Sequence, residues 1–180
     1  INITDDVIAP FVDQPASYGT REGELFEIEM VDSANGWAVG DIRLRTDDFR
    51  ETILANFLFR YADGIWTPIA TPVSWVEPSG SEAPVRDLAV TDFDTVWILS
   101  WDSAIHRYFN GQWQTVHPPR EMSSDEPYYN ALTMLSADNG WAAGNAFLHY
   151  DGQAWQVTQP ISDSIYALTM VSAEDGWAVG

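Results

Sequence analysis

The sequence contains no cysteine and no lysine, and its longest apolar runs are short. Without cysteine, disulfides, zinc–thiolate sites and cysteine nucleophiles are excluded. A membrane helix needs about 20 consecutive apolar residues, so no segment is predicted to span a bilayer. All eight basic residues are arginine, against 27 acidic residues, and the formal net charge is −19. This acidity repels phosphates and anionic lipids, so a nucleic-acid partner is not expected.

The chain is rich in tryptophan, with nine residues, and its hydrophobic content is 46%. This composition predicts a folded globular chain rather than a disordered one. The absence of cysteine and lysine, together with the low pI, favours an extracellular or cell-surface location. The chain begins at Ile1 and ends at Gly180, inside a repeat described below, so we expect it to be part of a longer protein.

Four segments share a tryptophan that follows an alternating apolar stretch. These tryptophans are Trp37, Trp97, Trp141 and Trp177, separated by 60, 44 and 36 residues. Apolar residues stand nine and seven positions before each one, a period-two pattern that predicts a β-strand. The residues five positions before each tryptophan are predicted to cap turns; they are Asp32, Asp92, Ser136 and Ser172.

A second signature places a tyrosine five residues before another tryptophan. The pairs are Tyr61 and Trp66, Tyr108 and Trp113, and Tyr150 and Trp155. The dipeptides Asp63-Gly64 and Asn110-Gly111 are centred in the first two copies, and they tolerate the positive φ angles of a type I′ hairpin turn. Such a turn puts each tyrosine opposite its tryptophan as a cross-strand pair. The third copy has Asp-Gly shifted by one residue, so a different loop is expected there.

Each repeat therefore predicts four short antiparallel strands, and the shorter intervals suit one blade of a β-propeller. The predicted fold is an all-β propeller with three complete blades and the start of a fourth, preceded by a lead-in segment over residues 1–24. The predicted blades cover residues 25–68, 84–116, 129–158 and, in part, 165–180. A closed propeller needs about four to eight blades. We therefore expect further chain, or another subunit, to complete the ring.

The Gly-Trp-Ala-Val-Gly segment followed by a Tyr-Asp-Gly-x-x-Trp hairpin resembles the bacterial-neuraminidase-repeat-like propellers, which include the photosystem II assembly-factor type. The resemblance covers residues 25–180 and implies a propeller fold with a binding or scaffolding role. The Asp-box of sialidases is echoed only in part, because Tyr61, Tyr108 and His149 stand where that motif has serine. Sialidase activity is therefore not expected.

In a four-stranded meander, the connections from strand two to three and from blade to blade share one face. All the long segments fall in these connections, over residues 41–55, 68–83 and 117–128. Long loops on a rigid scaffold commonly carry binding function, so this face is the predicted binding face. Trp75 lies outside the repeat register and either packs under its own loop or offers a platform to a sugar or a protein. The candidate ligand-binding residues are Arg43, Arg45, Arg50, Trp75, Arg120 and Glu121.

No catalytic or metal-binding motif stands out, and no cofactor is predicted. Clusters of carboxylates are expected by chance among 27 acidic residues, and the histidines lack the spacing of a zinc site. Ten aromatic residues are assigned to blade architecture: Trp37, Trp66, Trp97, Trp113, Trp141, Trp155, Trp177, Tyr61, Tyr108 and Tyr150. The sequence thus predicts a non-catalytic binding or scaffold module with a protein partner. The alternatives are a propeller that binds or processes carbohydrate and a structural repeat of a cell-surface assembly.

Overall fold

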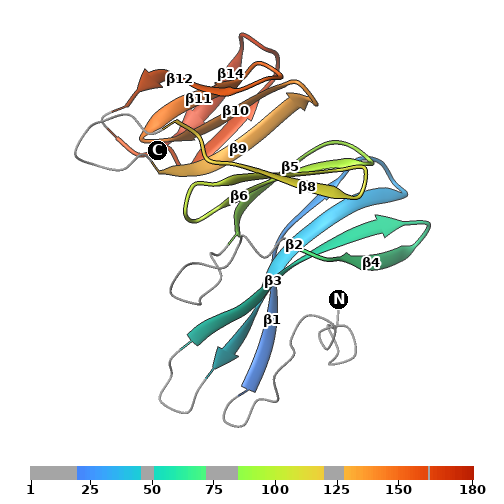
Figure 1. The fold of residues 1–180 in the computed structure, drawn as a ribbon. Helices are drawn as coiled ribbons and strands as arrows, with labels where there is room; N and C mark the ends of the chain where they lie inside the picture. The colour runs from blue at the N-terminus through green and yellow to red at the C-terminus, as the bar shows by residue number, and fades with distance from the viewer. Residues whose placement is uncertain (1–19, 46–50, 72–84, 120–127, 162) are drawn as a thin grey trace. The chain divides into compact units, whose positions relative to one another are not determined.

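The computed structural model describes residues 20–45, 51–71, 85–119, 128–161 and 163–180, and these contain strands joined by turns and connections (Figure 1). The chain divides into two compact units, residues 1–85 and 86–180. The division falls at the first residue of a strand, Val85, so the rest of that strand belongs to the second unit.

The first unit contains one antiparallel sheet in which sequential strands are neighbours (Figure 1). Its strands are β1 (Thr20–Met30), β2 (Asn35–Arg45), β3 (Glu51–Ala62) and β4 (Ile65–Ile69). The β1–β2 turn is capped by Asp32, whose carboxylate accepts a hydrogen bond of 2.7 Å from the Ala34 amide. Hydrogen bonds from Asn35 and Ala34 lower the pKa of this carboxyl group, as expected for a turn-capping aspartate.

The second unit contains two further meanders of four strands and a two-stranded sheet (Figure 1). The first meander comprises β5 (Val85–Asp92), β6 (Thr95–Ser100), β7 (Ile105–Phe109) and β8 (Gln112–Val116). The second comprises β9 (Tyr129–Ser136), β10 (Asn139–Gly144), β11 (Ala146–Tyr150) and β12 (Trp155–Pro160). The two-stranded sheet pairs β13 (Ala167–Met170) with β14 (Gly176–Val179).

The predicted hairpin turns are confirmed. Asp63 and Gly64 have φ angles of 51° and 83°, and Asn110 and Gly111 have 50° and 77°. Tyr61 accordingly lies opposite Trp66, with ring centroids 4.9 Å apart. The pair Tyr108 and Trp113 repeats this arrangement at 5.1 Å.

The third hairpin also pairs its tyrosine with its tryptophan, but through the longer loop that the shifted Asp-Gly predicts. Tyr150 lies opposite Trp155 at 5.2 Å. The carboxylate of Asp151 accepts hydrogen bonds of 2.9 Å from the amides of Gln153 and Ala154. These hydrogen bonds lower the pKa of Asp151 and replace the tight turn as the element that sets the register.

One prediction about the first unit is wrong. Residues 41–55 were expected to form a loop, but β2 continues to Arg45 and pairs with β3 from Glu51 onward. Asp41 lies opposite Asn56, and both residues are fully buried rather than solvated. The run from Asp41 to Arg45 alternates polar and apolar residues, which is itself a strand pattern. The inserted residues therefore lengthen the sheet.

A cationic or histidine side chain lies on the first tryptophan of each four-stranded sheet. The Arg60 guanidinium lies 5.7 Å from the Trp37 ring centroid, and that of Arg107 lies 4.9 Å from Trp97. His149 occupies the same cross-strand position opposite Trp141, at 4.5 Å. Each of these three side chains therefore packs on one face of an indole.

The core of the second unit lies between its two four-stranded sheets. Trp97 of β6 is 2% exposed and meets Tyr150 and Trp155 of the next sheet, at centroid distances of 5.1 and 6.2 Å. Leu99, Ile105, Leu132 and Leu148 complete this cluster together with several smaller residues. Edge-to-face aromatic pairs add stabilisation beyond the area they bury, so this contact anchors one sheet to the next.

We predict that Gly111→Ala destabilises the protein by about 1 kcal/mol, because an L-residue with a side chain is strained at its φ of 77°. Asn110→Gly, at the preceding turn position, relieves a positive φ and is expected to change stability by less than about 0.5 kcal/mol. Urea unfolding followed by tryptophan fluorescence measures both changes. Equal destabilisation by the two variants would contradict the assigned turn.

Candidate functional site

The structure describes only two of the six predicted binding residues. Arg43 and Arg45 lie in β2, where they pair with Ile53 and Glu51 of β3, rather than in the predicted loop. The other four lie outside the described residues, so their proposed roles stay predictions: Arg50, Trp75, Arg120 and Glu121.

The connections expected to share one face do so in the second unit. The Tyr128 amide, before β9, donates a hydrogen bond of 3.1 Å to Asn145 Oδ1, between β10 and β11. The Tyr129 amide donates to Ser103 Oγ, between β6 and β7, at 3.2 Å. Loops from two sheets thus meet at the end where β9 begins, as the meander topology requires.

A group of side chains at this end, here called the Trp101 platform, comprises Arg86, Trp101, Tyr128 and Asn130. The Arg86 guanidinium lies 3.8 Å from the centroid of the Trp101 ring, and the indole is 57% exposed. Arg86 also donates a hydrogen bond to Asn130 Oδ1, and Asn130 Nδ2 donates to the Ile165 carbonyl at 2.9 Å. One face of the indole is therefore fixed by a cation that is itself held in place.

The platform presents the exposed ring of Trp101, with the Arg86 guanidinium packed against one face of that ring. Burial lowers the pKa of Arg86, while the nearby Tyr128 opposes this shift; a guanidinium nevertheless stays protonated in proteins. The Tyr128 hydroxyl is hydrogen-bonded to Ser164, and its ring is partly exposed. Tryptophan, tyrosine and arginine are the residues that dominate protein–protein binding energies. A rigid ring loses little conformational entropy when it meets a partner.

Trp101 occupies neither of the two repeated tryptophan positions, and the sequence pattern did not single it out as a binding residue. Arg86 could not be recognised from the sequence, because it is a single polar residue within a strand, β5, and belongs to no repeated motif. The platform joins residues from β5, from the β6–β7 connection and from β9, and only the packing of two sheets brings them together.

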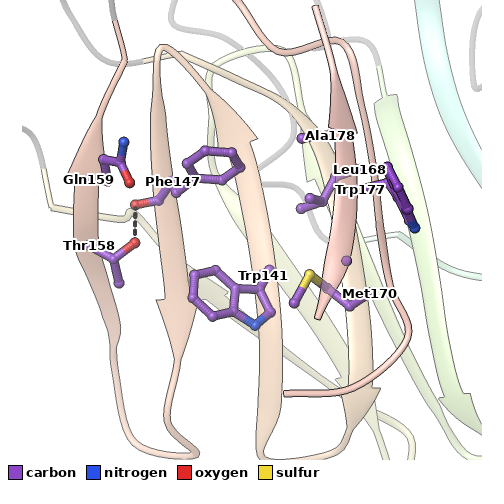
Figure 2. A pocket seen from close by; sticks show the side chains of 9 residues that line it. Trp141, Phe147, Thr158, Gln159, Leu168, Met170, Trp177 and Ala178 are labelled. Atoms are coloured by element: carbon purple, nitrogen blue, oxygen red, sulfur yellow. Dashed lines mark hydrogen bonds between the residues drawn. The ribbon is translucent and has the colours of Figure 1, made fainter. Parts of the chain in front are cut away.

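A groove forms a second candidate surface of the same unit (Figure 2). It lies between β10–β12 and the β13–β14 sheet and has a volume of about 360 Å³. Its lining is mainly apolar and consists of Trp141, Phe147, Thr158, Gln159, Leu168, Met170, Gly176, Trp177 and Ala178. Thr158 Oγ1 donates to the Phe147 carbonyl at 3.2 Å on the β12 side (Figure 2). The groove can accept apolar or aromatic side chains.

A serine, a histidine and an aspartate lie together at the end of β6 but do not form a catalytic triad. Ser100 Oγ lies 3.1 Å from His106 Nε2, and Asp102 bonds the serine rather than the histidine. The other ring nitrogen, Nδ1, lies 2.9 Å from Thr115 Oγ1. A nucleophilic serine needs a histidine that a carboxylate orients and a substrate that can approach. Ser100 and His106 are each 1% exposed, so this group holds strands together.

His106 provides a pH-dependent prediction. Burial lowers its pKa from 6.5 to about 4, so the folded protein keeps it neutral while the unfolded chain binds a proton below about pH 6.5. The stabilisation that comes from keeping His106 neutral is therefore fully present above about pH 6.5 and is lost as the pH falls toward 4. This difference in pKa lowers the free energy of unfolding at pH 4 by about 3 kcal/mol relative to pH 7. His106→Asn, which cannot titrate, is expected to be less stable than the parent at pH 7 and to close much of that gap by pH 4.

Urea unfolding at several pH values measures this difference, and the shared titration of the acidic residues cancels in it. A gap that stays constant between pH 7 and pH 4 would show that His106 does not titrate as described.

Among the residues that the structure describes, no group of three or more histidine, aspartate and glutamate side chains could hold a metal ion. Nor does any helix in this part of the chain have the length and apolar character needed to cross a bilayer.

Successive sheets of four sequential antiparallel strands are typical of the blades of a β-propeller, and comparison with known structures agrees. Two solved structures share this fold: YCF48 bound to D1 peptide, and YCF48 from Cyanidioschyzon merolae. Their TM-scores are 0.57 and 0.56, with sequence identities of 16% and 13%. The alignments cover 91% and 99% of this chain but 52% of each of those chains, so this chain spans about half their length.

At this identity the likeness shows the fold alone. The all-β propeller prediction is confirmed, and the resemblance to photosystem II assembly-factor propellers agrees with these structures at the level of the fold. No family model matches the chain, and no curated protein sequence gives a significant match.

Proposed function

We propose that the chain is a non-catalytic, protein-binding propeller module that contacts its partner through the Trp101 platform. The observation that carries the proposal is the exposed indole of Trp101, held by the guanidinium of Arg86 at 3.8 Å. Aromatic anchors supported in this way are typical of binding hot spots. A propeller of the same fold is recorded with a peptide bound, which supports a peptide or protein as the ligand class.

The position of the platform supports the same conclusion. It lies where connections of neighbouring sheets meet, on the face that the sequence predicts for binding. Loops on a rigid sheet scaffold are preferred places for recognition. The one described group that resembles a catalytic site, Ser100 with His106, is buried and lacks the required geometry. These features favour binding over catalysis.

The partner is expected to bring apolar or aromatic side chains to the indole. The formal net charge of −19 disfavours strongly acidic partners and nucleic acids. The carbohydrate alternative depends on Trp75, which lies outside the described residues, so it stays a prediction. The composition without cysteine or lysine supports an extracytoplasmic location as a further part of the proposal.

The test is selection of binding peptides from a random display library on the immobilised chain, followed by titration of the selected peptides. We expect Trp101→Ala to weaken their binding by about 30-fold, the size typical of a hot-spot residue. Phe109→Ala is the matched control, because Phe109 is also an exposed aromatic residue, 42% exposed, but lies at the opposite end of its sheet.

Peptide affinities that survive Trp101→Ala but fall in Phe109→Ala would place binding on the opposite face and reject the proposal. So would saturable binding on a glycan array together with no selected peptide, which would favour the carbohydrate alternative.

A further inference from the structure

Three residues other than glycine have a positive φ in the part of the chain that the structure describes. Two of them, Asp63 and Asn110, precede a glycine in the hairpin turns whose sequence predicts this conformation. The third is Ser103, with a φ of 65°, and it stands in the β6–β7 connection before Ala104. Left-handed backbone disfavours residues with a side chain, and residues held in it cluster at functional sites. The conformation of Ser103 therefore needs a separate reason.

Ser103 is the last residue of a three-residue loop that begins with Trp101. The Ser103 amide donates a hydrogen bond of 2.9 Å to the Ser100 carbonyl, and the Ser100 amide donates one of 3.0 Å to the Ala104 carbonyl. Loops of this kind commonly end in a left-handed residue, and glycine suits that position best. Serine is less favourable there than glycine, so the hydroxyl group is the feature that has to explain its presence.

The Ser103 hydroxyl ties this loop to the neighbouring sheet. Its Oγ accepts the hydrogen bond of 3.2 Å from the Tyr129 amide at the start of β9. Ser103 is 9% exposed and Tyr129 is 1% exposed, so both groups are shielded from water. A buried amide that loses its acceptor is costly. Glycine would suit the backbone but would leave this amide without the hydroxyl oxygen.

The same hydrogen bond completes a closed ring of contacts around the indole of Trp101. Next to Tyr129 in the chain is Asn130, whose Oδ1 accepts a hydrogen bond from Arg86. The Arg86 guanidinium lies 3.8 Å from the centroid of the Trp101 ring, and Trp101 belongs to the same loop as Ser103. One contact therefore holds the indole itself, and the other holds the backbone that carries it.

A shorter connection in the next sheet shows that a blade does not require this loop. The connection between β10 and β11 consists of Asn145 alone, whereas the one between β6 and β7 covers residues 101–104. Asn145 also contacts the chain before β9, because its Oδ1 accepts a hydrogen bond from the Tyr128 amide. The longer connection differs in carrying an indole that is 57% exposed. Its additional residues therefore present a side chain rather than close the sheet.

We propose that Ser103 is a positioning residue of the Trp101 platform, and that its hydroxyl group fixes the indole of Trp101 in place before a partner binds. This inference rests on the proposed function, since it assigns a role within the same site. A side chain that is already fixed loses less conformational entropy on binding than a mobile one. Ser103 is buried, so it raises the affinity for the partner without touching it.

The test separates the hydroxyl from the backbone with two variants of the whole chain. Ser103→Gly removes the hydroxyl and relieves the positive φ, so two opposing effects leave the midpoint of urea unfolding close to that of the parent. Ser103→Ala removes the same hydroxyl but keeps a Cβ at a φ of 65°, so it should unfold at a lower urea concentration.

Both variants are expected to weaken binding of the peptides selected on the parent chain by about 3- to 10-fold, which is the cost of immobilising one side chain. A binding loss that follows stability would contradict this expectation. A large loss in Ser103→Ala together with none in Ser103→Gly would show that the serine has a structural role only, and it would overturn the proposal.

Asn110→Gly is the matched control, because it relieves a φ of 50° in the same way but at the opposite end of β7. Its affinity for the peptides should equal that of the parent. In a Trp101→Ala background, Ser103→Gly should have no further effect, since the indole that the serine positions is absent. An undiminished loss in that background, or an equal loss in Asn110→Gly, would reject the assigned role.

A measurement without a ligand keeps this inference separate from the proposed function. The chain is labelled with fluorotryptophan, and the fluorine NMR resonance of Trp101 is assigned by its absence in Trp101→Phe. Both serine variants should move and narrow this resonance, because the ring is no longer held against Arg86, whereas Asn110→Gly should leave it in place.

An unchanged Trp101 resonance in both serine variants would overturn the inference, even where Trp101→Ala abolishes peptide binding. The converse result is peptide binding that survives Trp101→Ala together with a resonance that moves in both serine variants. That result would reject the proposed function and would support the positioning of the indole by Ser103.

Discussion

The contact between Trp97 and the pair Tyr150–Trp155 is the interaction on which the second unit depends. It joins two sheets that share no strand, and it does so by burying three large rings at a single place. A four-stranded meander has no core of its own, since each face must be covered by something else. The aromatic contact solves this problem between the two four-stranded sheets of the second unit, and the leucine and isoleucine side chains around it fill the remaining space.

Local geometry decides whether that contact can form. The tyrosine and tryptophan act together because a hairpin of fixed register puts them opposite each other. In two sheets the register is set by positive φ angles at Asp63-Gly64 and Asn110-Gly111. In the third it is set by the side chain of Asp151. Two different turns thus give the same aromatic pair. The pair recurs in all three four-stranded sheets, whereas the type of turn does not.

These local relations are what sequence reasoning could predict. The alternating strands, the turn caps at Asp32 and Asp92, and the pairing of Tyr108 with Trp113 depend on residues close together in the chain. The Trp101 platform could not be predicted in the same way, because Arg86 and Asn130 are 44 residues apart and meet only through sheet packing. Asp41 was misassigned for a related reason: a charged residue suggests a loop, and only its pairing with β3 shows that it is buried.

The two faces of each four-stranded sheet carry different aromatic residues. One face carries the tyrosine–tryptophan pair and the other carries the first tryptophan of the repeat, so the two four-stranded sheets of the second unit meet head to tail rather than by identical surfaces. A head-to-tail contact has no internal limit and ends only when a ring closes or when a different surface covers the last receptive face. The Trp101 platform is built differently, from residues at the starts of β5 and β9 and from the connections beside them. Residues of the platform can therefore change without disturbing the aromatic contact that packs one sheet on the next.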